Sequence, residues 1–421
     1  MGDKPGSPIN LVVSTVKEAE NLVPLLKEYQ QAGRPVNVSL FNIVSQTRSV
    51  SSNLNFDQVL YGFPLHPSAI PGLAGVFKEV GPKGLSIMVD HPQQLEYAKS
   101  LAEASGHAPL IFMKIDGGYH RAGVIPHTKT STELVNDAVR LHSEGSAVFH
   151  GLYIHAGHSY DTRENWQALK YLLEEVEVLG RFADTIDAGS AQIPLVLSVG
   201  ASPTATSLQH PCLTKPDDCS HQDSEVCRSL RTQMRTLKSK GYRIEAHAGV
   251  YPTLDLQQLA THARGPELLN SSDIAISILA DVVSLYPGRG PNDTTEALIN
   301  VGCLGLGREP CKDLGPEKGV HYNGWGIVMP WPEAGSTNTP LTSEFPAVHG
   351  GWQVVKVSQE HGILGWKGDK ADEFPLKVGQ RIRIWPNHSC IAGSFFDWYL
   401  VVDSRKEGAR DTVVDAWPRW R

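Results

Sequence analysis

A histidine and a cysteine lie two residues apart in WPNHSC, the segment that follows the apolar stretch QRIRI. If the segment continues as a strand, residues i and i+2 face the same side, so the His388 imidazole and the Cys390 sulfur would lie side by side. Zinc accepts both kinds of ligand. The alternative is a buried cysteine beside a surface histidine, because two ligands are too few to define a metal site. The spacing alone leaves both interpretations open.

Polar residues also crowd the ends of four apolar segments in the first two thirds of the chain. These segments are FMKIDGGYHRAG, YIHAGHSY, LSVGASPTAT and EAHAGVY. If each is a strand of one parallel barrel, the polar ends meet at the face where such folds place their sites. Glycines and hydroxyls there expose backbone N–H groups and suit an anion such as a phosphate. Gly200 or Gly249 taken singly could be a turn glycine, so it is the repetition that indicates a site.

Seven apolar segments alternate with amphipathic helical patterns in this part of the chain. The predicted strands cover residues 10–14, 58–63, 85–89, 109–116, 149–157, 194–200 and 243–249. This alternation indicates a parallel sheet with helices outside, and the length favours a (β/α)8 TIM-type barrel over an open doubly wound sheet. No G-x-G-x-x-G motif opens a helix after the first strand, which argues against a dinucleotide fold. Because a barrel needs eight strands, we expect the first one to be missing.

The pattern changes after about residue 274. Apolar β-type segments linked by Gly/Pro-rich turns follow, with few helical patterns between them. This composition is typical of an all-β unit. We therefore predict an α/β protein with two domains: residues 1–273, a barrel incomplete at its N-terminus, and residues 274–421, a β-rich domain that carries His388 and Cys390.

Composition narrows the class of protein. The chain has 421 residues and a net charge of -7, which does not favour a nucleic acid or an anionic membrane as partner. No apolar run reaches the length of a membrane span and the start lacks a signal-peptide core, so the cytoplasm is the default expectation. Six cysteines without a C-x-x-C pair indicate reduced thiols. Cys212, Cys219 and Cys227 fall in a polar stretch for which a surface insertion is expected, with metal binding as the alternative.

The motifs together resemble one enzyme group. VSTVKEAE, VLYGFPL, FMKIDGGYHRAG, GLYIHAGHSY, VGASPTAT, HAGVYPTLDLQQ, SQEHG and PNHSC, in this order, are similar to the D-serine dehydratase and D-threonine aldolase family. That family belongs with the alanine-racemase-like, fold type III pyridoxal-phosphate enzymes. The resemblance runs from about Asn10 to Asp403. It implies a pyridoxal-phosphate barrel with a β-rich second domain, a site between the two, and a homodimer whose partner often completes the site.

The resemblance also assigns residues. Ser202 and Thr204, with the backbone of Gly249, Val250 and Tyr251, would hold the cofactor phosphate. Three further side chains would line the cofactor pocket: Arg121, Tyr160 and His247. A neutral His247 would be a moderate partner for the cofactor ring nitrogen, and a satisfied residue at the barrel rim is the alternative. His388 and Cys390 match the family's metal pair.

The metal pair separates members of the family. D-threonine aldolases tend to carry a carboxylate where Cys390 stands, and the softer sulfur favours zinc over magnesium or manganese. We therefore expect D-serine dehydratase chemistry, in which β-elimination from a small D-amino acid gives pyruvate and ammonia. Zinc would make the β-hydroxyl a better leaving group. D-threonine aldolase is the alternative, and alanine racemases, which need no metal pair, fit less well.

Family members bind the cofactor as a Schiff base with a lysine on the first barrel strand, upstream of the VVST segment. This chain is expected to begin after that point, so the missing lysine and the missing strand would be one absence. None of Lys4, Lys17 and Lys114 matches the position, and the catalytic lysine is left unassigned. The chain as written is therefore expected to be impaired in catalysis, and an inactive remnant that still binds cofactor phosphate or metal is a second possibility.

The segment VSLFNIVSQTRSVSSNLNFDQ, residues 38–58, is rich in Ser and Asn and lacks periodicity. It separates a helix from a strand that relatives join closely. Val-Ser and Gln codons can carry intron boundary sequences, so a retained intron is one hypothesis and a genuine surface loop is the other. Continuous coverage of the segment in mature transcripts would refute the first.

Overall fold

The computed structural model describes residues 10–32, 58–186, 194–214, 220–311, 322–330, 351–403, 405–406 and 412–419. Three features discussed above therefore lie outside the described residues: Lys4, Cys219 and residues 38–57 of the proposed insertion. Gln58, the last residue of that segment, is buried directly before a strand that begins at Val59, and its Nε2 lies 3.1 Å from the Nε2 of His150.

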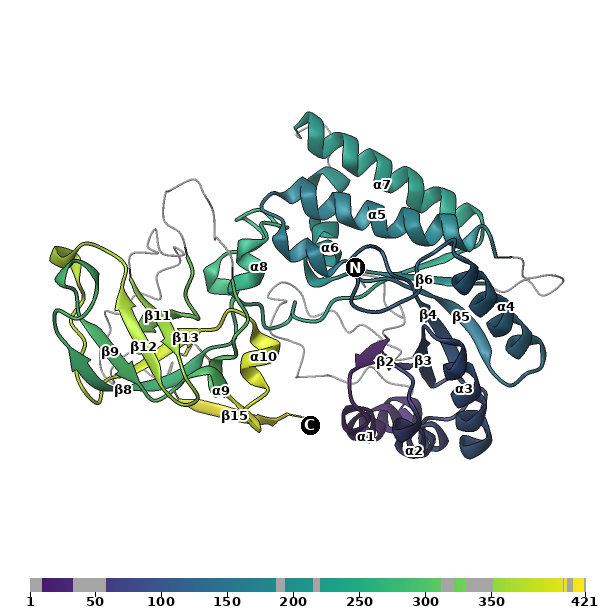
Figure 1. The fold of residues 1–421 in the computed structure, drawn as a ribbon, viewed down its shortest axis with the longest axis horizontal. Helices are drawn as coiled ribbons and strands as arrows, with labels where there is room; N and C mark the ends of the chain where they lie inside the picture. Colours follow the sequence, from purple (N-terminus) through teal and green to yellow (C-terminus); the bar gives the residue numbers. More distant parts are fainter. Residues whose placement is uncertain are drawn as a thin grey trace.

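The first unit is built on a parallel sheet whose strands follow the order of the chain (Figure 1). Its seven strands are β1 (Leu11–Val13), β2 (Val59–Pro64), β3 (Leu85–Val89), β4 (Leu110–Lys114), β5 (Val148–Tyr153), β6 (Val196–Val199) and β7 (Arg243–Ala246). Each pairs with the next in parallel register. All seven strands predicted from the sequence are confirmed.

Helices between the strands lie on the outer side of this sheet (Figure 1). They are α1 (Val16–Ala32), α2 (Ile70–Val80), α3 (Pro92–Ser105), α4 (Lys129–Ser143), α5 (Asn165–Ala183) and α7 (His221–Ser239). Local signals set several ends: the Thr128 hydroxyl accepts from Ser131 N–H at the start of α4, and Gly106 ends α3 in the left-handed region. Helix α2 was not predicted, because Pro71 and two glycines interrupt its pattern.

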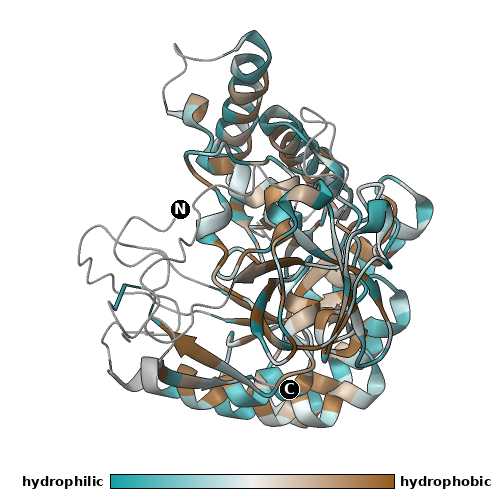
Figure 2. Cartoon of the chain, turned by 90° about the vertical axis from the view of Figure 1, so that its left-hand side faces the viewer, coloured by the Kyte–Doolittle hydropathy of each residue, from teal (hydrophilic) through white to brown (hydrophobic). Residues whose placement is uncertain are grey.

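The core lies between the sheet and these helices. Strands β3 and β4 are buried along their whole length, as expected when helices cover one face of a parallel sheet and the barrel interior covers the other. Figure 2 shows the strands coloured mostly as hydrophobic, whereas the helices alternate between hydrophobic and hydrophilic residues. The alternation is the amphipathic pattern from which the helices were predicted.

The sheet is open, with β1 and β7 at its two edges. Asn10, just before β1, donates a side-chain hydrogen bond to the Glu245 carboxylate on β7. This bond brings the edges within side-chain reach at one point, as expected for a barrel-like sheet with seven strands. The predicted TIM-type fold is confirmed in this seven-stranded form.

The second unit is a closed antiparallel barrel with the strand order β10-β11-β12-β9-β8-β13. Its strands are β8 (Ile278–Tyr286), β9 (Glu296–Ile299), β10 (Ile327–Pro330), β11 (Trp352–Val357), β12 (Gly362–Trp366) and β13 (Arg381–Trp385). A separate hairpin joins β14 (Trp398–Val402) to β15 (Val413–Pro418). The β-rich character of this part is confirmed, and the boundary at residues 273/274, which lies between β7 and β8, stays a prediction.

Four short helices flank the junction of the two units: α6 (Ser202–Thr206), α8 (Leu256–Ala260), α9 (Cys303–Leu306) and α10 (Ser389–Gly393). Helices α8 and α10 lie on the sides of the units that face each other (Figure 1). Backbone hydrogen bonds from Leu256 N to Pro386 O and from Gln257 N to Asn387 O join the two sides directly. Segments 130 residues apart in the sequence thus meet at this junction.

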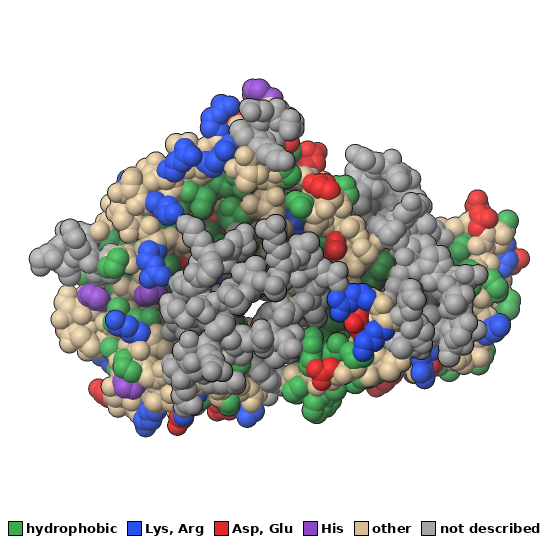
Figure 3. Space-filling model, turned by 180° about the vertical axis from the view of Figure 1, so that it is seen from behind, with side chains coloured by type: hydrophobic (Ala, Val, Ile, Leu, Met, Phe, Trp, Pro, Cys, Tyr) green, Lys and Arg blue, Asp and Glu red, His purple; other side chains and the backbone are tan. Residues whose placement is uncertain are grey.

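The described surface has a mixed charge. On the face shown in Figure 3, acidic and basic side chains both occur around the rim. No helix in the described ranges combines the length and apolar character that a membrane span requires.

The redox state and burial of the cysteines agree only partly with the prediction. Cys227, Cys303, Cys311 and Cys390 are free, in line with the prediction of reduced thiols. Cys212 is disulfide-bonded, so the prediction is wrong for that residue. Cys212 and Cys227 are also buried rather than exposed, because they pack into the core beside α7.

Candidate active site

The segment that carries His388 and Cys390 is a turn followed by a helix, and not the strand assumed above. Strand β13 ends at Trp385, His388 is the residue that precedes α10, and Cys390 is the second residue of that helix. The prediction that His388 and Cys390 share one face of a strand is therefore wrong. Proline at 386, which cannot donate to a strand ladder, explains why the strand stops.

Asn387 anchors this turn to the second unit. Its side chain is buried, donates to the backbone oxygens of Glu309 and Gly324, and accepts from the Tyr322 hydroxyl at 2.6 Å. All of its hydrogen-bonding groups in the side chain are thus used to hold the turn. His388 is left half-buried and Cys390 exposed, so both side chains are accessible.

Ser202 and the segment after β7 form one cluster. The backbone N–H groups of Gly249 and Val250 both donate to the Ser202 hydroxyl oxygen, at 3.3 and 3.1 Å. Among the described residues, no atom would lie within 4 Å of a Cβ on Gly249, so these residues leave space beside the two N–H groups. Converging N–H groups, a hydroxyl and open space are features that suit a phosphate.

Two other residues predicted for the phosphate site lie differently. Thr204 is fully buried and its hydroxyl donates to Glu175 Oε2 at 3.0 Å while it accepts from Ala201 N–H. Tyr251 follows Val250 directly and is 48% exposed. Phosphate binding by the Thr204 side chain and by the Tyr251 backbone stays a prediction.

Tyr160 lies between the Ser202 cluster and the metal-ligand turn. Its ring is nearly parallel to that of His388, with centroids 6.4 Å apart and an interplanar angle of 12°. Burial raises the pKa of Tyr160 to about 12, and hydrogen bonding to the side chains of Ser202 and Gln258 partly offsets that rise. Tyr160 therefore interacts with one predicted phosphate residue, Ser202, and lies beside one predicted metal ligand, His388.

His247 has a defined tautomer. Ser198 donates its hydroxyl proton to Glu245 Oε1 at 2.8 Å, so its oxygen must accept from His247 Nδ1, 3.0 Å away. His247 Nε2 is then left as an acceptor, and among the described residues this buried atom has no hydrogen-bond partner. Burial, followed by the charges of His155 and Lys114, holds the pKa of His247 well below its usual value. A neutral imidazole with a free acceptor fits a donor such as a protonated ring nitrogen.

The Tyr153 ring stacks on the His247 imidazole at 4.0 Å, and the Lys114 ammonium lies 4.4 Å from the centroid of Tyr153. Lys114 is the one buried lysine among the residues that the structure describes. Burial lowers its pKa to about 7, with the nearby charge of Arg121 as the next cause. Arg121 itself is exposed, 5.4 Å from the Tyr119 ring, on the loop after β4.

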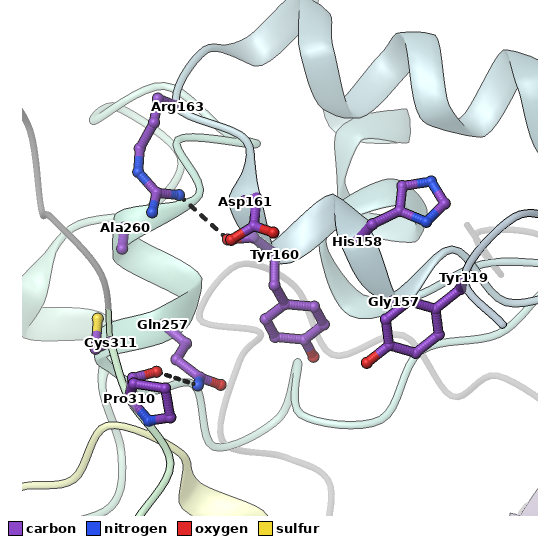
Figure 4. Close-up of a pocket in the computed structure, with 10 residues that line it drawn as sticks. All are labelled: Tyr119, Gly157, His158, Tyr160, Asp161, Arg163, Gln257, Ala260, Pro310 and Cys311. Carbon is purple, nitrogen blue, oxygen red and sulfur yellow. Dashed lines mark hydrogen bonds between the residues drawn. The ribbon is translucent and has the colours of Figure 1, made fainter. Parts of the chain in front are cut away.

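A cavity of about 220 Å³ opens beside Tyr160 (Figure 4). Tyr119 and His158 line it from the first unit, Gln257 from α8, and Pro310 and Cys311 from the second unit. The Gln257 amide donates to Pro310 O at 2.8 Å and closes the cavity where the two units meet. A small molecule that entered here would reach Tyr160.

Three residues with clear roles in this arrangement were not predicted: Ser198, Glu175 and Asp255. Asp255 had a usable signal, since an aspartate directly before LQQLA is typical of a helix N-cap. Its side chain does accept from Gln258 N–H at 2.9 Å. The partners of Ser198 and Glu175 come from other strands and helices, and no local pattern indicates them.

Comparison with known proteins supports the family that the sequence motifs indicate. Residues 275–402 match the family model described as "Putative serine dehydratase domain", and residues 73–215 match the alanine racemase N-terminal domain. The D-serine dehydratase of Schizosaccharomyces pombe is 31% identical over 419 residues, which cover 98% of this chain and 79% of that protein.

Solved structures share the fold. D-threo-3-hydroxyaspartate dehydratase from Delftia sp. HT23 has a TM-score of 0.62 at 24% identity, with 97% of this chain and 83% of that one covered. A mutant of that enzyme solved in a metal-free form has a TM-score of 0.63 at 23% identity, with 98% and 84% covered. The family and the fold inferred from the sequence motifs are confirmed, and the chain belongs to the D-serine dehydratase family, lyases with the alanine-racemase-like fold of fold type III pyridoxal-phosphate enzymes.

Proposed function

We propose that the chain is a lyase dependent on pyridoxal phosphate and zinc that converts D-serine into pyruvate and ammonia. The observation that carries the proposal is the position of Tyr160, which interacts with the Ser202 side chain and stacks against His388. A cofactor held by its phosphate and an ion held by the His-Cys pair would then act on one substrate molecule. D-serine dehydratase is the name of the relative from Schizosaccharomyces pombe, and we propose the same activity for this chain.

Ser202 and the N–H groups of Gly249 and Val250 would hold the cofactor phosphate, with Thr204 and Tyr251 as predicted neighbours. His247 Nε2, a buried acceptor without a partner among the described residues, would accept a hydrogen bond from the ring nitrogen. Arg121 and Tyr160 would line the remaining sides of the pocket. When bound, the cofactor supplies an electron sink for removal of the Cα proton.

His388 and Cys390 would hold the divalent ion, and their nitrogen and sulfur donors favour zinc. An ion held by these two residues would supply Lewis-acid chemistry, which would make the substrate β-hydroxyl a better leaving group. Surrounding protein raises the pKa of the Cys390 thiol by desolvation, with the Asp255 charge as the next cause, even though the residue is exposed. A bound cation reverses that preference, because a coordinating thiol is deprotonated.

Cys390 also favours β-elimination over aldol cleavage, since the aldolases of the family tend to carry a carboxylate there. The test is a product assay on the purified chain with pyridoxal phosphate and Zn²⁺. We expect pyruvate and ammonia from D-serine, formed slowly, because no lysine of the chain is assigned as the Schiff base. Glycine and acetaldehyde from D-threonine would indicate an aldolase instead.

Variants at the metal pair sharpen this assay. Cys390→Ala should abolish both zinc binding and pyruvate formation, and Cys390→Asp should shift the metal preference toward Mn²⁺ or Mg²⁺. Cys303→Ala is the matched control, because Cys303 is a free, half-buried cysteine at the start of α9. No product from the wild-type chain, with zinc and cofactor bound, would support the inactive remnant.

Two further parts of the proposal concern assembly and location. We propose a homodimer in the cytoplasm, by analogy with the family. Sedimentation of the purified chain with bound cofactor tests the first part, and a monomer would contradict it.

A further inference from the structure

The metal-ligand turn is held by the segment that directly follows the phosphate cluster. Beyond the two backbone hydrogen bonds from α8 to Pro386 and Asn387, side chains of Thr253 and Asp255 reach Ser389. Ser389 stands between His388 and Cys390 and is itself buried. Because Ser389 is bonded to both His388 and Cys390 in the chain, its position constrains the backbone positions of these two residues.

Asp255 holds Ser389 through the backbone. Its carboxylate is fully buried; one oxygen accepts from Gln258 N–H at 2.9 Å and the other accepts from Ser389 N–H at 2.9 Å. Because a carboxylate only accepts, both oxygens are matched to donors, and these charge-assisted bonds are stronger than neutral ones. One side chain thus starts α8 and also fixes the turn from the other unit.

Thr253 connects the turn to the phosphate cluster. Its hydroxyl lies 2.9 Å from the Ser389 hydroxyl. Its backbone N–H donates to Val250 O at 3.2 Å, and the N–H of Leu254 donates to the same oxygen at 2.9 Å. Since Val250 N–H donates to Ser202 Oγ, a continuous hydrogen-bonded path runs from Ser202 through Val250 and Thr253 to Ser389.

We propose that Thr253 and Asp255 are positioning residues that couple occupancy of the phosphate cluster to the geometry of the His388–Cys390 pair, so that pyridoxal phosphate and Zn²⁺ each strengthen binding of the other. This inference rests on the proposed function. A phosphate that orders the Gly249–Val250 backbone also orders Thr253, and through it Ser389. Outer partners of metal ligands commonly set metal affinity, and coupling between two binding sites is reciprocal.

The test measures the Zn²⁺ dissociation constant by competition with a chelator, with and without pyridoxal phosphate. For the wild-type chain we expect tighter binding with pyridoxal phosphate, by about 5-fold or more, a typical size for such coupling. Asp255→Asn keeps the shape of the side chain but replaces one accepting oxygen with an NH₂ group, which cannot accept from the Gln258 or Ser389 N–H. Because Ser389 would then be held less firmly, Zn²⁺ binding should weaken about 10- to 100-fold. Thr253→Val should remove the effect of pyridoxal phosphate on Zn²⁺ affinity, and Thr253→Ser should restore it.

A matched control and a second readout exclude a general loss of structure. Thr261→Val removes another fully buried hydroxyl, one that donates to Gln258 O at 2.8 Å, and should leave both dissociation constants unchanged. With Co²⁺ as the probe, the thiolate-to-metal charge-transfer band should respond to pyridoxal phosphate in wild type and Thr253→Ser but not in Thr253→Val.

The outcomes separate this inference from the proposed function. A wild-type chain that binds both ligands with the same Zn²⁺ affinity in either condition overturns the coupling alone. Unchanged coupling in Thr253→Val also overturns it. A wild-type chain that binds neither ligand overturns the proposed function, and the coupling with it.

Discussion

Single residues at the site were predictable where a motif carries them, but their geometry was not. His388 and Cys390 could be chosen from the sequence, yet the assumed strand ends at Trp385 and a five-residue helix begins at Ser389. Asp255 shows the opposite case. Its N-cap signal is local, but its bond to Ser389 spans 134 residues, and only the tertiary fold brings the two together.

The tautomer of His247 leads to a prediction at this scale. Ser198→Ala removes the acceptor of His247 Nδ1–H, so the proton can move to Nε2, which would then donate instead of accept. We expect pyridoxal phosphate to bind about tenfold more weakly, in line with the 1–3 kcal/mol cost of an unmatched buried polar group. Titration of cofactor absorbance measures the affinity.

Ser86→Ala is the matched control for that change. Ser86 is fully buried on β3, in the same sheet, and its hydroxyl donates to Val59 O at 3.3 Å. Its loss should leave cofactor affinity unchanged. Equal weakening in both variants would show that the Ser198 effect is general destabilisation.

Lys114 leads to a second prediction, on the pH dependence of stability. Its pKa is lowered from 10.5 to about 7 by burial, so between those values the unfolded chain binds more protons than the folded one. The free energy of unfolding therefore gains a term that rises with pH, by up to about 1.4 kcal/mol per pH unit. Lys114→Met should remove this term between pH 8 and 9.5.

Titration of Glu175 does not contribute in the range from pH 8 to 9.5. Burial raises the pKa of Glu175 to about 7, so this group titrates below that range. Urea unfolding of wild type and Lys114→Met at several pH values gives the two slopes. Parallel slopes would show that the Lys114 amine keeps an ordinary pKa in the folded protein.

At the scale of elements, alternating apolar strands and amphipathic helices predicted most of the first unit. Among the elements that were missed, α2 and β12 each contain a glycine whose added Cβ would collide with a neighbouring segment. A Cβ on Gly362, at the start of β12, would lie 2.4 Å from Val301 O, so close packing of the second barrel requires glycine there. Such contacts are invisible in the sequence, where glycine indicates only a turn or a break.

A pair of glycine substitutions with opposite expected signs tests this reasoning. In β5, a Cβ on Gly151 would lie 2.1 Å from Val196 O of the neighbouring strand. Gly151→Ala must push β5 and β6 apart, and should lower the free energy of unfolding by about 1–3 kcal/mol. Gly75 is exposed in α2 and a Cβ there meets nothing within 4 Å.

Gly75→Ala should therefore raise the free energy of unfolding by about 0.5–1 kcal/mol, because alanine loses less backbone freedom on folding. Denaturant unfolding of the two variants beside wild type gives both values. A stable Gly151→Ala variant with unchanged midpoint would mean that β5 and β6 are further apart than described.

At the scale of the whole molecule, the sequence predicted two units but not how they meet. The junction is formed by hydrogen bonds from residues 253–257 to residues 386–389, and neither segment shows a pattern that indicates the other. Motif resemblance placed both segments in one site because family members share it. Physical reasoning from the sequence alone gave the elements and the ligand types, and the structure adds the contacts that join them.

This arrangement leads to a prediction about metal removal. If His388 and Cys390 bind Zn²⁺ only when their turn is folded against the first unit, the ion stabilises the native state by mass action. At a free Zn²⁺ concentration 100 times the dissociation constant, the gain is about 2.7 kcal/mol. Adding a chelator should therefore lower the midpoint of thermal unfolding of the wild-type chain.

Cys390→Ala should start from the lower midpoint and show no response to the chelator, whereas Cys303→Ala should respond as wild type does. A chelator effect of equal size in Cys390→Ala would place the stabilising ion elsewhere in the molecule.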